Sequence, residues 1–276
     1  MLALSFPSFD LEMLAWLVFV PLFFAVKDKR PAVAFLLSYL SGIVFFALTV
    51  FWLAHVTLPG VIVLILYLAL YFGIFGFCVS FFSSLPVISY LLSVSAVWVL
   101  LEYLRSYLLT GFGWALLGYS QYLTLPVVQI ADITGVWGIS FLIMAVNIAL
   151  FTVLERRKSL SVAYYLLPAV LLLATLGYGF YQLNRPPAAD HQPRIKISVI
   201  QGNIPQELKW QSNAQGLILD RYLGLSRDAG QDKPDLLVWP EASSPGFLGE
   251  DDWVFDDIFS MVKHLRTNLL VGTVAA

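Results

Sequence analysis

The sequence predicts a polytopic α-helical membrane domain followed by a smaller, partial α/β domain. Of its 276 residues, 59% are hydrophobic and 12% are charged, whereas soluble domains carry about 25% charged residues. No Asp, Glu, Lys or Arg occurs between Pro31 and Leu101. Thirteen of the 34 charged residues lie in the first 183 positions and 21 in the last 93, where the hydrophobic pattern also changes. A membrane part therefore comes first and a polar part second.

Six stretches qualify as membrane spans, since a spanning helix needs about 20 largely apolar residues to cross about 30 Å of hydrocarbon. These stretches are 11–26, 33–53, 61–82, 87–107, 133–154 and 161–181. The first fits least well because it is short and contains Glu12. Residues 1–6 are apolar but too few to span, and we expect them to be the remnant of an N-terminal helix.

The basic residues predict the orientation of the membrane part. Six of the seven Lys and Arg residues in the first 183 positions lie in two short loops, 27–30 and 155–158. Short cytoplasmic loops carry an excess of such residues. An even number of predicted spans separates the two loops, so both can face the cytoplasm. We therefore expect the C-terminal domain on the outside, which is the periplasm in a Gram-negative bacterium.

Residues 184–194 contain three prolines and predict a linker between a domain at 1–183 and a domain at 195–276. Beyond the linker, 195–204 alternates and is β-branched, as in a strand. A helical pattern at 213–230, a strand at 235–241, an amphipathic helix at 251–268 and a third strand at 269–276 follow. This alternation of strands and helices predicts an α/β layered domain.

Composition also limits the partners and cofactors. The net charge of −2 gives no support for nucleic-acid binding, which a basic patch would indicate. Cys78 is the single cysteine, so the sequence allows no intrachain disulfide and no cysteine-based metal site. Cys78 lies in an apolar stretch with no basic residue nearby, which predicts a buried structural thiol. The three histidines are scattered, and no metal or organic cofactor is implied.

Glu241 is the candidate catalytic residue. It follows the apolar run "LLVWP", at the predicted carboxyl end of a strand. Active sites of α/β sheets gather at the carboxyl ends of the strands, and partial burial there would suit a carboxylate to general-base work. An exposed acid that begins a loop is the alternative.

Two aromatic-rich segments hold candidate substrate-binding residues. Trp210 ends a proline-containing turn after the first predicted strand, where it could bind an acyl chain or be a packed loop residue. Segment 100–123 contains Glu102 and Arg105, which can pair on one helix face, and Trp114. Charges at membrane depth usually face a protein interior. The segment is thus either a floor for a lipid headgroup or acyl chain, or an interfacial loop with an aromatic belt.

Five stretches, taken in order, resemble the bacterial apolipoprotein N-acyltransferases. They are "LSFPSFDLEMLAWLVFVPL", "EYLRSYLLTGFGWALLGYSQ", "ITGVWGISFLIMAVN", "VIQGNIPQELKW" and "LLVWPEA". The resemblance covers essentially the full chain. It implies a multi-span domain in the bacterial inner membrane, joined to a periplasmic nitrilase-like α-β-β-α sandwich, of which 195–276 would be the N-terminal part.

The resemblance implies a reaction in two steps. A Cys thiolate takes an acyl chain from a phosphatidylethanolamine-like donor, and the amino group of a diacylglyceryl-cysteine lipoprotein then accepts it. Glu241 matches the catalytic Glu of the family, and Trp210 matches a loop Trp near the substrate. The Cys and Lys of the family motif have no counterpart in these 276 residues. We therefore expect a chain truncated at both ends and inactive alone.

Two other functions remain open at this point. A membrane-anchored nitrilase-type amidase would use the same triad on a soluble amide, although it would not need the segment "TGFGWALLGYSQ". A non-catalytic lipid-binding membrane protein would bind phospholipid without forming a thioester.

Overall fold

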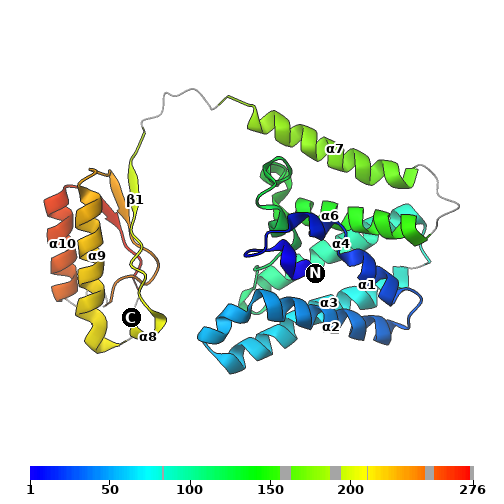
Figure 1. Ribbon diagram of the computed structural model, residues 1–276, viewed down its shortest axis with the longest axis horizontal. Coiled ribbons are helices and arrows are strands. Elements are labelled where there is room, and N and C mark those ends of the chain that lie inside the picture. Colours follow the sequence, from blue (N-terminus) through cyan, green and yellow to red (C-terminus); the bar gives the residue numbers. More distant parts are fainter. Residues whose placement is uncertain (83, 156–162, 187–193, 210, 246–251, 274–276) are drawn as a thin grey trace. The chain divides into compact units, whose positions relative to one another are not determined.

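The computed structural model describes residues 1–82, 84–155, 163–186, 194–209, 211–245 and 252–273. It contains two compact units, Met1–Pro186 and Pro187–Ala276. The first unit is helical, and the second is built from strands and helices in alternation (Figure 1).

Five helices in the described part of the first unit are long and apolar enough to cross a membrane. They are α2 (Pro31–Thr49), α3 (Leu58–Phe82), α4 (Val87–Tyr107), α6 (Ala131–Glu155) and α7 (Ala163–Leu183). Each matches a predicted span, and α4 has the predicted bounds. Pro31 opens α2 at a position where its missing N–H costs no helical hydrogen bond. The prediction of a polytopic membrane domain is confirmed.

The predicted span at 11–26 is not among these five helices and corresponds to a shorter apolar stretch, Glu12–Val26. This stretch folds into a 3₁₀-helix, η2 (Glu12–Trp16), followed by the short helix α1 (Phe19–Val26). Eight residues of α-helix extend only about 12 Å, which is less than half the hydrocarbon thickness. Residues Leu2–Ser5 form a further 3₁₀-helix, η1.

Side chains from distant helices hold this N-terminal segment in place. The buried Asn147 amide of α6 accepts a hydrogen bond from the Phe19 N–H (2.9 Å) and donates to the Ala15 carbonyl (2.8 Å). The Phe19 N–H is one of the first N–H groups of α1, which have no partner inside their own helix. Gln121 accepts a bond from the Trp16 indole N–H (2.9 Å) and donates to the Glu12 carbonyl (3.0 Å).

Replacing Asn147 by leucine, of similar size, should therefore destabilise the first unit. The Phe19 N–H and the Ala15 carbonyl would stay buried without this partner, and each such group costs about 1–3 kcal/mol. Thermal unfolding in detergent should show a melting temperature well below that of the unchanged chain. Asn184→Leu is the control, because the exposed Asn184 bonds only to Phe180 one turn earlier. Equal melting temperatures for the two variants would contradict this role of Asn147.

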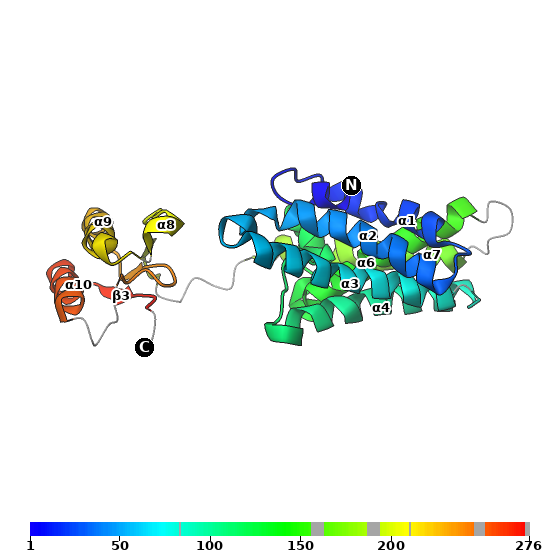
Figure 2. The same cartoon turned by 90° about the horizontal axis from the view of Figure 1, so that it is seen from below.

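The core of the first unit is aromatic. The Trp98 ring on α4 makes edge contacts with Phe19, Phe72 and Phe75, at centroid distances of 4.8, 5.1 and 4.9 Å. Helices α2 and α3 lie side by side (Figure 2). Gly76 allows their close approach, since a Cβ there would lie 2.6 Å from the Ala34 carbonyl oxygen. Small residues at such contacts are typical of helices packed inside membranes.

Short elements connect α2 to α3 and α4 to α6. They are η3 (Phe51–His55), η4 (Leu108–Thr110), η5 (Leu117–Gln121) and α5 (Leu125–Val128). At one end, the Lys27 Nζ lies 2.8 Å from the Glu155 Oε1, so the two basic loops begin side by side. At the other end, Trp52 of η3 contacts Trp114. The prediction that both basic loops lie at one end of the bundle agrees with this contact.

The second unit is a three-stranded parallel sheet in the order β1-β2-β3, with two long helices on one face (Figure 1). Its elements are β1 (Ile197–Val199), α8 (Gln206–Lys209), η6 (Ser212–Ala214), α9 (Gln215–Gly230), β2 (Leu236–Val238), α10 (Asp252–Leu265) and β3 (Asn268–Leu270). The buried Leu237 of β2 belongs to a core shared with Leu219 of α9 and Val254 of α10. The predicted α/β layering is present, although each strand pairs over only three residues.

The opposite face of this sheet is apolar and uncovered by the described residues. Val199, Val238 and Leu270 are in register across the three strands. Val199 is 75% exposed and Leu270 60% exposed. An aligned apolar row of this kind is a surface on which another layer can pack.

Candidate functional site

Glu241 lies at the carboxyl edge of the parallel sheet, just beyond β2. The strand ladder continues one residue past β2, where the Trp239 N–H donates to the Leu270 carbonyl at 2.9 Å. The Trp239 indole is buried, donates to the Ser226 hydroxyl at 2.8 Å and packs on the Tyr222 ring. This anchor fixes the position at which the chain leaves the sheet, so Pro240 and Glu241 emerge at its edge.

The Glu241 side chain is exposed to solvent in this chain. Of the two environments that the sequence left open, partial burial or an exposed start of a loop, the structure has the exposed one, shortly after the end of β2. Ala242 follows in a left-handed conformation, with a φ of 47°, so the chain turns sharply after the carboxylate.

The segment after β3 supports the turn that carries Glu241. The Gly272 carbonyl accepts hydrogen bonds from the N–H groups of Ser243 (3.0 Å) and Ser244 (3.2 Å). A Cβ at Gly272 would lie 2.5 Å from the Pro240 carbonyl oxygen and 2.6 Å from the Glu241 Cα. The ends of β2 and β3 thus touch backbone to backbone directly under the candidate base.

We expect Gly272→Ala to displace Glu241. Those two distances are too short for any Cβ, and both contacts are with backbone, which cannot rotate away. Overpacking of this kind costs about 1–3 kcal/mol. Amide hydrogen exchange at Ser243 and Ser244 should rise, because their N–H groups bond to Gly272. Gly216→Ala on α9 is the control, since a Cβ there would meet no atom within 4 Å. Unchanged exchange at the two serines would contradict the expected displacement.

The carboxyl end of β1 lies at the same edge of the sheet. The Gly202 backbone amide hydrogen-bonds to the Tyr222 hydroxyl, and burial raises the pKa of that hydroxyl. The Gln201 amide then donates to the Asn203 Oδ1 at 2.7 Å. The Ile200 N–H also donates to the Val238 carbonyl at 2.9 Å, so the end of β1 is tied to β2 and, through Tyr222, to α9.

The second group of candidate residues lies in the first unit. Glu102 and Arg105 are both buried on α4. Arg105 donates to the Trp114 carbonyl (2.7 Å) and to the Ala115 carbonyl (3.4 Å), and the Glu102 Oε1 accepts from the Leu117 N–H (2.6 Å). The described ion pairs do not include Glu102 with Arg105. The two side chains do not form a close ion pair: each binds the backbone of the following loop, while their opposite charges still stabilise each other.

This fixed loop presents Trp114 at the surface. Trp114 is 60% exposed, and its ring lies 5.2 Å from the ring of Trp52 on η3, which is 40% exposed. Tryptophan side chains with one apolar body and one polar N–H are typical of the membrane interface. The two rings form an exposed aromatic pair.

The structure brings some predicted residues together and leaves others apart. Glu102, Arg105 and Trp114 form one cluster in the first unit, and Glu241 belongs to the second unit. Trp210 lies outside the described residues. Cys78 is half-buried in α3. The described residues hold no group of three or more His, Cys, Asp or Glu side chains placed to bind a metal.

Sequence reasoning missed Trp52 and Gly272. The signal for Trp52 was its position at the outer end of a predicted span, where interface aromatics gather. The contact that makes Gly272 important joins two strand ends 31 residues apart, so nothing in the local sequence could indicate it.

The fold and the site define a multi-pass membrane protein with a separate α/β unit that carries a carboxylate at the edge of its sheet. The family model for the apolipoprotein N-acyltransferase N-terminal domain matches residues 1–149. The whole chain is 39% identical to an apolipoprotein N-acyltransferase of Geobacter metallireducens, and 98% of it is 30% identical to one of Vibrio parahaemolyticus. This chain belongs to the apolipoprotein N-acyltransferase family.

The chain spans about half the length of these relatives. It covers 55% of the Geobacter metallireducens protein and 54% of the Vibrio parahaemolyticus protein. A third relative, from Chlorobaculum tepidum, is 27% identical over 99% of this chain and is covered over 53% of its own length. Five apolar helices together with this family fit a multi-pass protein of the bacterial inner membrane.

Proposed function

We propose that this chain forms part of an enzyme that transfers an acyl chain from a membrane phospholipid to the N-terminal amino group of a diacylglyceryl-cysteine lipoprotein. The observation that carries the proposal is Glu241, a solvent-accessible carboxylate fixed at the carboxyl edge of the sheet in a member of this family. Its proposed role is that of general base.

In the first step a thiol gives its proton to the Glu241 carboxylate, and the thiolate attacks the ester carbonyl of the phospholipid. The carbon–oxygen bond breaks, a thioester forms, and the lysophospholipid alkoxide takes the proton from Glu241. In the second step the lipoprotein amine attacks the thioester. Glu241 removes the ammonium proton of the tetrahedral intermediate, and the thiolate leaves and is protonated. A lysine would stabilise the oxyanion in both steps.

The thiol and this lysine are proposed to come from outside these 276 residues. Cys78 is the single cysteine of the sequence and lies in α3, within the membrane unit. Lys196 stands at the amino end of β1, where its Nζ donates to the Asp232 carbonyl at 2.6 Å. That is the opposite end of the strand from the edge that carries Glu241. We expect the chain alone to transfer no acyl group.

The apolar row Val199, Val238 and Leu270 supports a nitrilase-like α-β-β-α sandwich for the complete domain. In such a sandwich a second sheet and its helices would cover this face. The proposed domain division is 1–183, a linker at 184–194, and 195–276 as the first part of the sandwich.

The membrane unit is proposed to bind the lipid parts of the substrates. Trp114 and Trp52 would contact a phosphatidylethanolamine-like donor or the lipoprotein acceptor, while Glu102 and Arg105 fix the loop that holds Trp114. Trp210 would contact substrate from the second unit. The basic loops, close together at Lys27 and Glu155, support a cytoplasmic position for that end. The last span then leads to the periplasm.

A chimera tests the proposal. Residues 1–276 would be joined to the part of the Geobacter metallireducens relative that lies beyond its match, and the unaltered relative would serve as a positive control. The chimera is incubated with phosphatidylethanolamine and a diacylglyceryl-cysteine peptide, and mass spectrometry detects the N-acylated peptide. We expect product from the chimera and none from residues 1–276 alone.

Two outcomes would contradict the proposal. Turnover by residues 1–276 alone would show that the thiol is not supplied from elsewhere. Hydrolysis of a small soluble amide by the chimera, with no acylated peptide, would instead support the amidase.

A further inference from the structure

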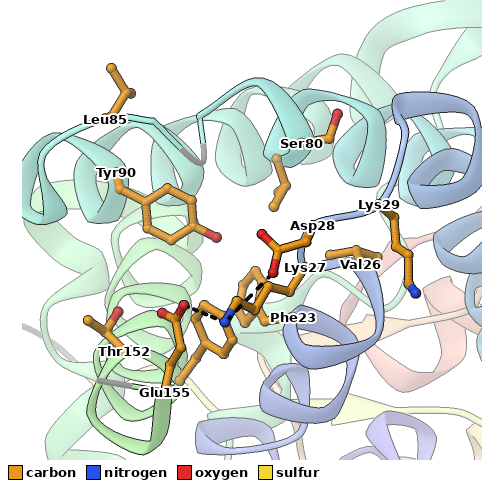
Figure 3. Close-up of a pocket in the computed structure, with 12 residues that line it drawn as sticks. Phe23, Val26, Lys27, Asp28, Lys29, Ser80, Leu85, Tyr90, Thr152 and Glu155 are labelled. Atoms are coloured by element: carbon orange, nitrogen blue, oxygen red, sulfur yellow. Dashed lines mark ion pairs between the residues drawn. The ribbon is translucent and has the colours of Figure 1, made fainter. Parts of the chain in front are cut away.

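Polar side chains gather at two further places in the described chain. Around a cavity of about 100 Å³ in the membrane unit, the Lys27 Nζ lies 2.8 Å from the Glu155 Oε1 and 3.8 Å from the Asp28 Oδ2, so opposite charges already meet there (Figure 3). The second place is the carboxyl end of β1, where the exposed side chains of Gln201 and Asn203 stand at the edge that carries the candidate base. Their contacts indicate a further part of the site.

The carboxyl ends of β1 and β2 lie next to each other. The Ile200 N–H donates to the Val238 carbonyl at 2.9 Å, in the parallel register of the residues before it. The same register brings Gln201 to the level of Pro240, one residue before Glu241. Neighbouring strands lie about 4.8 Å apart, so a substrate group that reaches the Glu241 carboxylate also comes within reach of the Gln201 side chain.

One tyrosine supports both strand ends. The Tyr222 ring of α9 packs on the ring of Trp239, two residues before Glu241, at a centroid distance of 4.9 Å. The same ring touches Gly202, where a Cβ would lie 2.7 Å from it. Gly202 stands between the two carboxamide residues, so their backbone is fixed against the anchor that also fixes the exit of β2.

The two carboxamides orient each other. The Gln201 Nε2 donates to the Asn203 Oδ1 at 2.7 Å. Asn203 has a φ of 50°, a left-handed conformation that Asn adopts more readily than most residues. Within the described residues, the Gln201 Oε1 accepts no hydrogen bond. Gln201 therefore presents an exposed, oriented acceptor next to the candidate base.

An oriented acceptor suits a ligand with an N–H group. The reacting ester of a phospholipid offers only oxygen acceptors, whereas a lipoprotein substrate reacts through an amine. We propose, on the basis of the proposed acyl transfer, that the Gln201 Oε1 binds an N–H of the acceptor amine in the second step. Asn203 is a positioning residue that holds the Gln201 carboxamide.

This contact directs the attack on the thioester. With one N–H on Gln201 and the other facing Glu241, the lone pair of the amine nitrogen points toward the thioester carbon. The carbon–nitrogen bond forms, Glu241 takes the ammonium proton, and the carbon–sulfur bond breaks as the thiolate leaves and is protonated. The first step involves no amine, so it does not depend on Gln201.

Gln201→Leu in the chimera separates the two steps, since leucine has no acceptor. Intact mass follows formation of the acyl-enzyme from phosphatidylethanolamine, and its decay is then timed after a diacylglyceryl-cysteine peptide or a small thiol is added. We expect acyl-enzyme formation and decay by the thiol to stay unchanged. Decay by the peptide should slow by about three- to ten-fold, the range of one hydrogen bond. Gln231→Leu, at another exposed glutamine of the same unit, should change none of these rates.

Two variants at Asn203 test its positioning role. Asn203→Asp keeps an oxygen for the Gln201 Nε2 and should transfer the acyl chain to the peptide at nearly the normal rate. Asn203→Gly adopts the same φ without strain but removes this oxygen. It should slow transfer to the peptide and leave transfer to the thiol unchanged.

The outcomes distinguish the role of Gln201 from the proposed function. Failure of the unaltered chimera to form an acyl-enzyme would overturn both. Normal acyl-enzyme formation, with equal peptide rates in Gln201→Leu and Gln231→Leu, would overturn only the role of Gln201. Equal slowing with the peptide and the thiol would also overturn that role, because it would show that the substitution displaces Glu241.

Discussion

Replacing Glu241 by glutamine in the chimera lowers the rate of lipoprotein N-acylation by at least about 100-fold, the usual size of a lost general base. Glutamine keeps the size and the hydrogen-bonding shape of the side chain, but it cannot take a proton from the thiol or from the ammonium intermediate. Because Glu241 is exposed, the substitution leaves no buried group without a partner. The melting temperature should therefore stay the same while the rate falls.

Two further variants make this result specific. Glu241→Asp keeps the carboxylate but withdraws it by one methylene, so we expect an intermediate rate. Asp220→Asn removes an exposed carboxylate of the same unit and should leave the rate unchanged. A Glu241→Gln rate within a few-fold of the unaltered chimera would contradict the proposed role of Glu241.

Replacing Arg105 by leucine should release the loop that carries Trp114. The Trp114 and Ala115 carbonyls would lose their buried donor, and Glu102 would lose the cation three residues away on the same helix. Removing one partner from such a buried charged group costs about 3–5 kcal/mol. Arg105→Lys should recover only part of this loss, since one ammonium cannot reproduce the fork of a guanidinium.

Two measurements check the Arg105 prediction. The melting temperature in detergent should fall, and amide hydrogen exchange over residues 108–118 should rise more than in the rest of the first unit. Arg30→Leu is the control, because Arg30 is an exposed arginine of the same unit, in a basic loop at the other end of α2. A protected loop in Arg105→Leu would show that other contacts hold it.

The membrane helices could be predicted from the sequence because the relevant signal is local. A run of 71 residues without a charge, 31–101, has few alternatives to spanning helices, and α2, α3 and α4 account for most of it. The basic residues predicted that both loops lie on the same side of the membrane, and the contact between Lys27 and Glu155 is consistent with that arrangement.

The features that the sequence did not reveal depend on contacts between residues that are far apart in the sequence. Stretch 11–26 has the composition of a span, but Asn147 and Gln121 bind its backbone from more than 100 residues away and accommodate a broken helix. The spacing of Glu102 and Arg105 suggested a pair, whereas the backbone groups of residues 114–117 compete for both side chains. Glu241 could be placed at a strand end, but its support by Gly272 depends on the pairing of β2 with β3.

The intact mass of the chimera, measured after incubation with phosphatidylethanolamine and no acceptor peptide, tests the role of Glu241 most directly. We predict a mass increase of one acyl chain that hydroxylamine removes, as expected for a thioester. The same increase should form at least about 100-fold more slowly in Glu241→Gln. An acyl-enzyme that forms equally fast in both proteins would contradict the assignment of Glu241 as the base.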